Sequence, residues 1–376
     1  MRPISVLIPR LANPEWGIGG GGRAAIRLAN GISSGGLLTD LIVFGSENAF
    51  RSEISPKVHL IELNASDWLS AFFKLQRYVL QVRPLAIIAQ DNRAAVLAIA
   101  IRELNDIPMC IIITVHSTLS RRWSEVSLLK KFFVRNFLRL FYLKADAVVG
   151  VSKAAAEDIV SLMRLPKDHV KVVYNPVVSE ELFMKAKEEP RLPWFAPDDP
   201  PVILSVGRLR KAKDFATLIK AFALVRRKRE VRLVIIGEGE LRDELEKLVR
   251  ELGIEHDVMM PGMVKNPYPY MARAAVFVLS SVYEGLPTVL IEALALGTPI
   301  VSTDCPSGPA EILENGKWGY LVRPGDPEMI AEAILQVLNR PRNSPPSEAW
   351  ARFTIKSSVE KYLRIIEERA NYRQCW

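Results

Sequence analysis

The sequence has 376 residues, of which 49% are hydrophobic and 24% are charged. This composition is typical of a globular protein and argues against a disordered or coiled-coil chain, and the length allows two domains with full cores. Every apolar run is shorter than the roughly 18 residues that a membrane-spanning helix needs. The cysteines are scattered, and the chain enters a strand-like run at residues 4–8 instead of a secretion signal. These features predict a protein of the reduced cytoplasm.

The formal net charge is +8, and most of the excess lies within residues 1–180. A basic half can bind nucleic acid or an anionic membrane surface, although many basic soluble proteins bind neither. We find no nucleic-acid-binding motif in the basic stretches and expect no nucleic-acid partner.

Strand-like apolar runs alternate with helical stretches, which predicts parallel α/β structure. In the first half these runs lie at residues 4–8, 39–44, 58–61, 85–89, 110–115, 147–150 and 170–173. After a proline-rich segment, further runs lie at residues 202–206, 232–236, 276–279, 299–302 and 319–322. We therefore expect an N-terminal Rossmann-like domain at 1–184, a linker at 185–201, a C-terminal Rossmann-like domain at 202–346, and a last helix within 347–376 that returns to the first domain.

A glycine-rich segment at residues 17–22 precedes a helical stretch at 24–32. Glycine lets backbone amides at a helix start approach a phosphate closely. Residues 9–16 separate this segment from the first strand, whereas a dinucleotide fingerprint follows its strand at once. The segment is therefore a weak signal for a dinucleotide cofactor.

Polar residues follow two of the apolar runs in the first half: Gln90-Asp91-Asn92 comes after one, and His116-Ser117 comes after another. Because the carboxyl ends of parallel strands meet at one edge of a sheet, we expect these side chains to face the same cleft. A single histidine at a strand end is often structural. Its place beside the glycine-rich segment makes His116 the first candidate for the reacting centre.

The stretch from residue 121 to residue 144 combines aromatic and basic side chains at helical spacing. One stripe contains Phe133, Phe137 and Phe141, and the other contains Lys131, Arg135 and Arg139. The simpler interpretation is a core-facing aromatic stripe with a solvated basic face. The alternative is docking on anionic lipid headgroups. The candidates for membrane contact are Arg121, Arg122, Lys130, Lys131, Arg135 and Arg139.

Arg208 and Lys213 follow the first expected strand of the second domain. In a strand-to-helix loop, a guanidinium and an ammonium group could neutralise a diphosphate, although isolated surface charges are commonly solvated. Glycine turns at residues 236–239 and 261–264 would let a base ring lie against the backbone.

The segment from Tyr283 to Ile312 contains the strongest pattern, a loop with Glu284 followed by a helix that Pro287 opens and Gly297 closes. The first-turn amides of this helix would attract a phosphate. Glu292, about one turn further on, could then reach a ribose hydroxyl pair. Two glutamates on a helix are often merely solvated, but this pair follows an apolar run, where α/β sheets bind ligands. The segment predicts a nucleotide-sugar site.

Several motifs in order resemble those of the retaining nucleotide-sugar glycosyltransferases of family 4, glycosyl transferases group 1. The motifs are Gly19-Gly20-Gly21-Gly22-Arg23, Thr114-Val115-His116, Val149-Gly150-Val151-Ser152-Lys153, Val173-Tyr174-Asn175-Pro176-Val177, Val206-Gly207-Arg208-Leu209 with Lys213, and Glu284-Gly285-Leu286-Pro287 followed by Glu292-Ala293. The resemblance covers nearly the whole chain. It implies an α/β GT-B fold, in which two Rossmann-like domains face each other across a cleft. In this fold the N-terminal domain would bind the acceptor, and the C-terminal domain would bind the nucleotide sugar.

The resemblance also implies roles for individual residues. The implied donor site comprises Gly19, Gly20, Gly207, Arg208, Lys213, Gly262, Val264, Glu284, Gly285, Leu286, Pro287, Thr288, Val289 and Glu292. The residues implied in catalysis are His116, Arg208, Lys213 and Glu284, with His116 touching the sugar. Acceptor-side candidates are Arg23, Asp91, Asn92, His116 and Ser117.

The implied reaction is front-face transfer with retention, in which cations and helix-end amides stabilise the diphosphate without a metal or other cofactor. Family habit favours a UDP-sugar over a GDP-sugar. The basic first half favours a lipid-linked or envelope-glycan acceptor and a cytoplasmic protein that is peripheral on the inner membrane face. Two positions depart from the family pattern: Gly22 stands where an acidic residue is often found, and Asp214 stands where a glycine often follows the lysine.

Three alternatives remain open. The enzyme could act on a small soluble acceptor, which turnover on a free sugar without liposome binding would favour. The glycine-rich segment could belong to a nicotinamide-dependent oxidoreductase, although this leaves Arg208, Lys213, Glu284 and Glu292 without a use. A non-catalytic sugar-nucleotide binder would bind the donor without hydrolysis or transfer.

Overall fold

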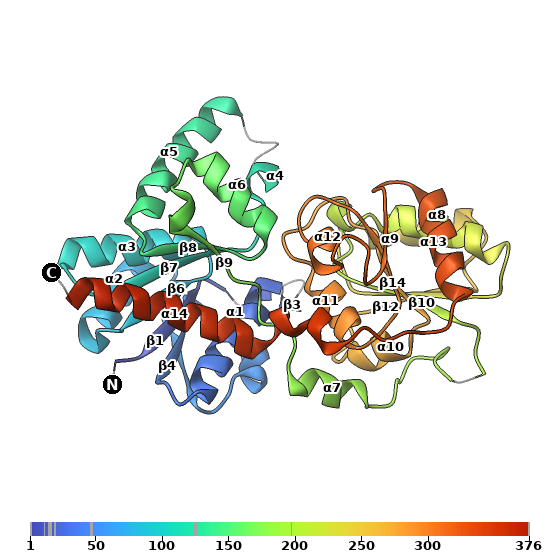
Figure 1. The fold of residues 1–376 in the computed structure, drawn as a ribbon, viewed down its shortest axis with the longest axis horizontal. Helices are drawn as coiled ribbons and strands as arrows, with labels where there is room; N and C mark the ends of the chain where they lie inside the picture. The colour runs from blue at the N-terminus through green and yellow to red at the C-terminus, as the bar shows by residue number, and fades with distance from the viewer. Residues whose placement is uncertain are drawn as a thin grey trace. The chain divides into compact units, whose positions relative to one another are not determined.

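The computed structural model describes residues 2–10, 12–13, 17–18, 20–45, 48–122, 127–196 and 198–374. The chain forms two compact units, shown in Figure 1. The first unit consists of Met1–Pro176 and Phe353–Trp376, and the second of Val177–Arg352. The first unit therefore ends at Pro176 and resumes after Arg352, whereas the sequence suggested boundaries at 184 and 346. The last helix belongs to the first unit.

A seven-stranded parallel sheet with the order β5-β4-β1-β6-β7-β8-β9 forms the centre of the first unit. Its strands are β1 Ile4–Ile8, β4 Thr39–Val43, β5 Val58–Glu62, β6 Ala86–Ala89, β7 Cys110–Val115, β8 Ala147–Gly150 and β9 Val170–Val172. A short antiparallel pair, β2 Ala12–Asn13 and β3 Gly17–Ile18, lies between β1 and the first helix in sequence. Both faces of the central strands are buried, which explains their uninterrupted apolar sequences.

Helices cover both faces of this sheet. They are α1 Gly20–Ser34, α2 Trp68–Val82, α3 Asn92–Asn105, α4 Leu119–Arg122, α5 Leu128–Lys144, α6 Lys153–Met163 and α14 Ile355–Gln374, with 3₁₀ turns η1 Asn48–Glu53 and η2 Lys167–His169. Because alternate strand residues face opposite sides, Leu7 packs in the core with α2, α3, α5 and α6, whereas Val6 packs in the core with α1 and α14. At Gly31, a Cβ atom would lie 2.4 Å from Ile355 of α14, so α1 and α14 touch where glycine leaves room (Figure 1).

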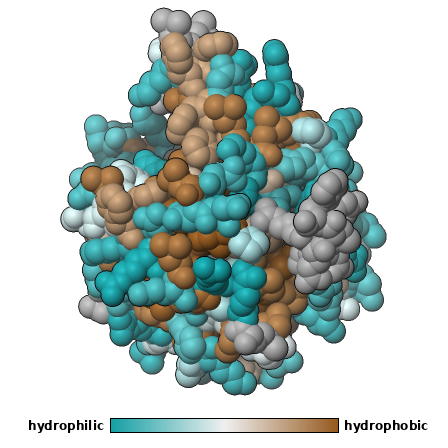
Figure 2. Space-filling model, turned by 90° about the vertical axis from the view of Figure 1, so that its left-hand side faces the viewer, coloured by the Kyte–Doolittle hydropathy of each residue, from teal (hydrophilic) through white to brown (hydrophobic). Residues whose placement is uncertain are grey.

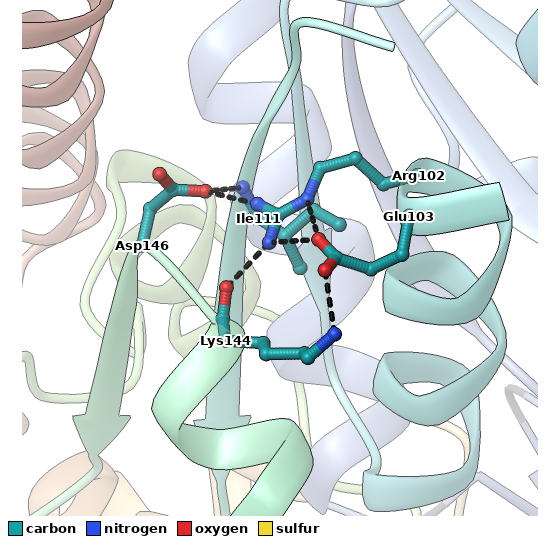
Figure 3. A network of polar contacts seen from close by, with 5 residues as sticks. All are labelled: Arg102, Glu103, Ile111, Lys144 and Asp146. Atoms are coloured by element: carbon teal, nitrogen blue, oxygen red, sulfur yellow. Dashed lines mark hydrogen bonds and ion pairs between the residues drawn. The ribbon is translucent and has the colours of Figure 1, made fainter. Parts of the chain in front are cut away.

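A partly buried ion network fixes the C-terminal end of α5 to α3 and β7 (Figure 3). Arg102 donates to Asp146 at 2.7 Å, and the backbone amide of Ile111 donates to the same carboxylate at 2.8 Å. Glu103 accepts from Lys144 at 2.6 Å, which together with Arg102 holds the pKa of Glu103 below its usual value. The network joins the end of α5 to α3 and β7, which are consecutive elements earlier in the sequence.

The core-facing interpretation of the aromatic stripe on α5 is wrong for two of its three members. Phe133 is 68% exposed and Phe137 is 53% exposed. The side of α5 that packs on the core instead carries Val134, Leu138, Phe141, Tyr142 and the adjoining Ala145. This side has the same helical spacing as the stripe, so spacing alone could not choose between them.

A six-stranded parallel sheet with the order β12-β11-β10-β13-β14-β15 forms the centre of the second unit. Its strands are β10 Val202–Val206, β11 Arg232–Ile236, β12 Val258–Gly262, β13 Val276–Leu279, β14 Ile300–Thr303 and β15 Tyr320–Val322. Its helices are α7 Glu180–Ala186, α8 Phe215–Arg226, α9 Arg242–Glu251, α10 Tyr268–Arg273, α11 Thr288–Ala295, α12 Pro309–Ile312 and α13 Pro327–Leu338. The 3₁₀ turns are η3 Lys211–Lys213, η4 Ser347–Ala349 and η5 Ala351–Phe353, the last ending at the unit boundary. These two parallel sheets confirm the expected α/β class.

The proline-rich segment expected as a linker lies within the second unit. Its backbone is bonded to side chains around α10. Asn266 donates to the carbonyl of Lys185, and Arg273 donates to the carbonyl of Glu188. The hydroxyl of Tyr270 accepts from the amide of Arg191. These bonds attach the described part of the segment to the body of the unit.

Candidate functional site

The start of α11 lies at the carboxyl end of β13, as the sequence predicts, but the helix begins one residue later than expected. Pro287 is the N-cap, with φ −70° and ψ 94°, and Thr288 is the first helical residue. Gly297 has φ +68° and follows the C-cap, so the helix ends where expected. Helix geometry leaves the first-turn amides, including those of Thr288 and Val289, without helical partners.

A neighbouring loop holds the residues before α11 in place. Ser307 donates from its hydroxyl to the carbonyl of Gly285 at 2.7 Å. Gly308 has φ +106°, and a Cβ atom there would lie 2.5 Å from the ring of Pro287, so only glycine fits. This loop therefore sets the backbone of Gly285, Leu286 and Pro287.

Glu292 is buried on α11, with 2% of its surface exposed. The hydroxyl of Tyr268, on α10, donates to its carboxylate at 3.2 Å. A solvated glutamate is therefore the wrong interpretation for this residue. Because burying a carboxylate is costly without hydrogen bonds, its position requires the polar partners that the fold provides. Sequence reasoning missed Tyr268, which has no motif of its own.

Lys213 and Glu284 form an ion pair with Nζ and Oε1 2.5 Å apart, and their side chains are 19% and 13% exposed. Ser281 also donates to Glu284 Oε1, at 2.7 Å. The loop of Lys213 follows β10, and the loop of Glu284 follows the adjacent strand β13. Bonds from Ser280 to the carbonyl of Lys213 and from Val282 to that of Ala212 join the two loops. We call Lys213, Tyr268, Glu284 and Glu292 the α11 cluster.

Asp214 adopts the left-handed backbone conformation, with φ 46° and ψ 49°, that a glycine would adopt at this position. Its carboxylate accepts from the amide of Thr217 at 3.3 Å and from the hydroxyl of Thr217 at 2.7 Å, which caps α8. Aspartate tolerates the left-handed region better than most residues. Asp214 therefore adopts a backbone conformation that glycine also adopts readily.

Arg208 follows β10 and is half-buried, and burial lowers the pKa of its guanidinium, with a smaller effect from Arg210. Gly207, beside it, approaches the next loop closely: Gly237 has φ +147°, and a Cβ atom there would lie 1.9 Å from the carbonyl oxygen of Gly207. Gly262 ends β12, and Val264 follows it. Gly207 and Arg208 follow β10, Gly237 follows β11, and Gly262 and Val264 lie at and just after the end of β12, so all of them are at the carboxyl ends of three neighbouring strands.

In the first unit, His116 follows β7 and is half-buried. Its Nε2 lies 2.8 Å from Oε1 of Gln90, which follows β6. Burial lowers the pKa of His116 to about 4, against a smaller opposite effect of Asp91. The imidazole is therefore neutral at pH 7. Gly21 lies beside this ring, since a Cβ atom there would be 3.9 Å from it, so the structure brings the glycine-rich segment and the histidine together.

The remaining residues expected in the first unit differ in their surroundings, and one of them lies outside the described residues. Gly20 begins α1, so the glycine run forms the first turn of this helix, and Arg23 is half-buried one turn on; Ser117 is half-buried after β7. Asp91 caps α3 by accepting from the amide of Arg93, and Asn92 accepts from the hydroxyl of Tyr142 at 2.9 Å. Gly19 lies outside the described residues.

The basic candidates near α5 differ in their contacts. Arg139 donates to the carbonyl of Met163 at 3.0 Å, and Arg135 lies over the ring of Phe132. Lys130 is exposed and Lys131 is half-buried. The side chains of Arg121 and Arg122 lie outside the described residues.

Within the described ranges, no helix is both long and apolar enough to cross a membrane. In the same part of the chain, no three His, Cys, Asp or Glu side chains are grouped to hold a metal ion.

Two family models match consecutive parts of the chain. The model described as "Glycosyltransferase Family 4" matches residues 18–181, and the model described as "Glycosyl transferases group 1" matches residues 186–356. Together they cover nearly the whole sequence.

Individual relatives extend this result. The chain is 36% identical to the N-acetylgalactosamine-N,N'-diacetylbacillosaminyl-diphospho-undecaprenol 4-alpha-N-acetylgalactosaminyltransferase of Campylobacter jejuni, over 63% of this chain and 64%, just under two thirds, of that enzyme. It is 30% identical to an uncharacterized glycosyltransferase of Methanocaldococcus jannaschii, over 80% of this chain and 83% of that protein. Anabaena HepE, solved in complex with UDP and glucose, has the same fold, with a TM-score of 0.77, 19% identity and coverage of 98% and 100%.

Proposed function

Because the chain belongs to the glycosyltransferases of group 1 and family 4 and has their GT-B fold, we propose that it transfers a sugar from a nucleotide-sugar donor, with retention of configuration. UDP is the favoured nucleotide, which the HepE complex with UDP supports. A lipid-linked or envelope glycan is the acceptor, at the cytoplasmic membrane face. The name of the Campylobacter relative, which includes a diphospho-undecaprenol acceptor, supports this choice.

The α11 cluster is the observation that supports this proposal most directly. An isolated buried carboxylate is costly, yet Glu292 is buried beside the start of a helix whose first amides have no helical partners. Phosphate bound to those amides leaves Glu292 about one turn, roughly 5 Å, further along, where it accepts from the ribose hydroxyls. Lys213 supplies a cation on the adjoining loop, and Glu284 binds hydroxyls of the transferred sugar.

The chemistry assigned to these residues is stabilisation of the departing diphosphate. Negative charge accumulates on the phosphates as the bond to the sugar breaks, and preorganised donors stabilise that charge. The Lys213 ammonium retains donor capacity beyond the bond that Glu284 accepts. Arg208 contributes a second cation. His116, which is neutral at pH 7, hydrogen-bonds the sugar and does not act as a proton-transferring base.

A thermal-shift panel of UDP, GDP, ADP and NAD tests the donor site. At about 100 times the dissociation constant, a ligand adds roughly 2.7 kcal/mol to the free energy of unfolding, which raises the melting temperature measurably. We expect UDP to stabilise the wild type and to lose this effect in Lys213→Met and Glu292→Gln. The glutamine keeps the shape of Glu292 and an oxygen for Tyr268, so the fold is expected to persist.

A matched pair provides the control. Lys247 and Glu251 also form an ion pair in the second unit, but both side chains are exposed. Lys247→Met and Glu251→Gln should therefore respond to UDP as the wild type does. If only NAD shifted the melt, or if the Lys213 and Glu292 variants responded like these controls, the proposed donor site would be wrong.

The acceptor side of the proposal includes docking of α5 on an anionic membrane. Its exposed apolar side chains are Phe132, Phe133, Phe137, Leu140 and Leu143. The view in Figure 2, onto the first unit, shows apolar side chains at its upper end, where α5 lies in Figure 1. Exposed aromatic side chains beside cations such as Lys130 fit a lipid interface, where the rings enter the headgroup region and the cations bind anionic lipids.

Cosedimentation with vesicles tests this docking. We expect binding to vesicles rich in phosphatidylglycerol at low salt, weaker binding to phosphatidylcholine vesicles, and loss of binding in a Phe133→Ser, Phe137→Ser variant. Met184→Ser is the control, because Met184 is 63% exposed but lies on α7 of the second unit. Failure of the wild type to sediment, with turnover on a free sugar, would favour a small soluble acceptor instead.

A further inference from the structure

Strand β12 has an extra residue near its carboxyl end, relative to its neighbour β11. Val234 of β11 pairs with Met259 of β12. Two residues further along β11, Ile236 pairs with Gly262, which lies three residues further along β12. An extra residue of this kind interrupts the ladder and bends the strand, and Pro261, beside it, has no N–H to donate. The end of β12 therefore needs support from outside the ladder.

Arg242, the first residue of α9, provides this support. Its Nη1 donates to the carbonyl of Met260, in the irregular part of β12, at 3.2 Å. Its Nε donates to Oε2 of Glu238 at 2.9 Å, and its Nη2 donates to Oε1 of the same carboxylate. Nη1 also donates to Glu246 of α9 at 2.9 Å. The planar guanidinium therefore joins the loop after β11, the end of β12 and α9.

The Glu238 carboxylate in turn lies against the backbone of Gly262. Gly262 has φ +82°, and a Cβ atom there would lie 2.8 Å from Oε1 of Glu238, so a larger residue does not fit. The carbonyl of Gly262 accepts from the amide of Gly237 at 2.9 Å, which connects the ends of the two strands. Arg242 therefore holds in place the carboxylate that packs on Gly262.

The position of Arg242 at a helix start supports a role beyond the stability of α9. The positive end of the helix dipole and the free first-turn N–H groups disfavour a cation there. The next two residues, Asp243 and Glu244, follow the usual preference for acidic side chains. Arg242 departs from it, which indicates that its contacts with Glu238 and Met260 account for the residue.

We propose that Arg242 is a positioning residue for the base of the bound nucleotide, because it fixes the Gly262 backbone against which the base lies. Glycine lets a planar ring approach the backbone closely, and backbone amides and carbonyls can pair with the edge of the base. Such hydrogen bonds weaken steeply when they are misaligned, so the backbone must be fixed. The binding of the base rests on the proposed function, whereas the effect of Arg242 on the end of β12 does not.

Amide hydrogen exchange of the free protein, followed by NMR, tests the structural step. Arg242→Met keeps the aliphatic stem but removes the guanidinium. The Gly237 amide reports directly on Gly262, whose carbonyl it binds, and we expect it to exchange at least about fivefold faster in the variant. The Leu233 amide binds the carbonyl of Asp257, at the other end of β12, and should change by less than about twofold.

Arg226→Met is the matched control. Arg226 is also partly buried, and its Nε donates to the Asp257 carboxylate at 2.7 Å, at the amino end of β12. Its loss removes a comparable ion pair from the same unit but leaves the carboxyl end of the strand untouched. The Gly237 amide should therefore exchange as in the wild type.

Binding and kinetics test the functional step. Arg242→Met should raise the dissociation constant of UDP and the KM for a UDP-sugar by about five- to tenfold, as expected for about one lost hydrogen bond. Its kcat should stay within about twofold of the wild type, because contacts to the base are the same before and during the reaction. Arg226→Met should leave both constants unchanged.

Unchanged exchange at Gly237 would overturn the proposal. So would equal acceleration at Gly237 and Leu233, which would indicate a general loss of stability, or a fall in kcat at unchanged KM. If the wild type itself bound no nucleotide, the proposed function would fail, and exchange at Gly237 would still decide whether Arg242 positions Gly262.

Discussion

Removal of the Lys213 ammonium is the perturbation that tests the α11 cluster most sharply. Lys213→Met keeps the aliphatic stem but leaves Glu284, which is 13% exposed, with Ser281 as a remaining donor. Hydrogen bonds to charged groups contribute about 1.5 to 3 kcal/mol, and exposed ion pairs about 0 to 1 kcal/mol. Because both side chains of this pair are largely buried, we expect a coupling free energy of about 2 kcal/mol.

A double-mutant cycle measures this coupling. The variants are Lys213→Met, Glu284→Gln and the pair together, and the free energy of unfolding is taken from urea titrations at constant m. With m of about 3 kcal/mol per molar urea, a loss of about 2 kcal/mol moves the midpoint by about 0.7 M. The exposed pair Lys247 and Glu251, whose charged atoms are 3.7 Å apart, should show a coupling of about 0.5 kcal/mol or less.

The same variants connect stability to catalysis. Loss of one charge-stabilising donor should lower kcat for a UDP-sugar by about 10²- to 10³-fold, equivalent to about 2.7 to 4 kcal/mol. A coupling no larger than that of the exposed pair would show that the contact does not order the site. A Lys213→Met enzyme that kept wild-type kcat would refute the role of this cation in stabilising the diphosphate.

Three further perturbations test other parts of the structure. Arg102→Met leaves the Asp146 carboxylate, which is 10% exposed, without its cation. We expect urea titrations to show a free energy of unfolding about 3 kcal/mol lower than that of the wild type. A value within about 1 kcal/mol of the wild type would contradict the network in Figure 3. The folded pKa of His116, about 4, is below the usual 6.5, so the unfolded chain binds more protons between these values and stability falls as pH decreases through this range. Between pH 7 and pH 4, the wild type should therefore lose about 3 kcal/mol more unfolding free energy than His116→Asn does. Equal losses in the two proteins would refute the low pKa. In a thermal melt, Asp214→Gly should cost only a few tenths of a kcal/mol, because glycine adopts the left-handed conformation freely. Asp214→Ala should cost about 1 to 2 kcal/mol, because it loses the cap of α8 and strains the backbone. Equal effects of the two substitutions would contradict the capping role.

The sequence alone predicted the two sheets well, because the strands are continuous apolar runs. The expected bounds of β1, β7 and β10 agree with the structure residue for residue. Both faces of a central parallel strand are buried, so its sequence differs sharply from the turns on either side. β12 was not predicted as a strand, since its sequence contains proline and glycine at its end.

The sequence was less informative about which side of a helix faces the core. On α5, two stripes share the helical period, and the exposed one contains Phe133 and Phe137. Hydrophobicity favoured the wrong stripe, because a large apolar side chain on the surface has the same local pattern as one in the core. Only the packing of α5 against α3 and α6 distinguishes them.

The sequence by itself determined the fold class, the family motifs and the order of the candidate residues. The tertiary structure decided their partners: Glu292 is buried with Tyr268, Lys213 pairs with Glu284, and His116 lies beside Gln90. Motif spacing is a local property of the chain, whereas burial and hydrogen bonding join residues that are dozens to hundreds of positions apart. Those contacts exist only once the strands of each sheet lie side by side, because strand order brings their carboxyl-end loops together.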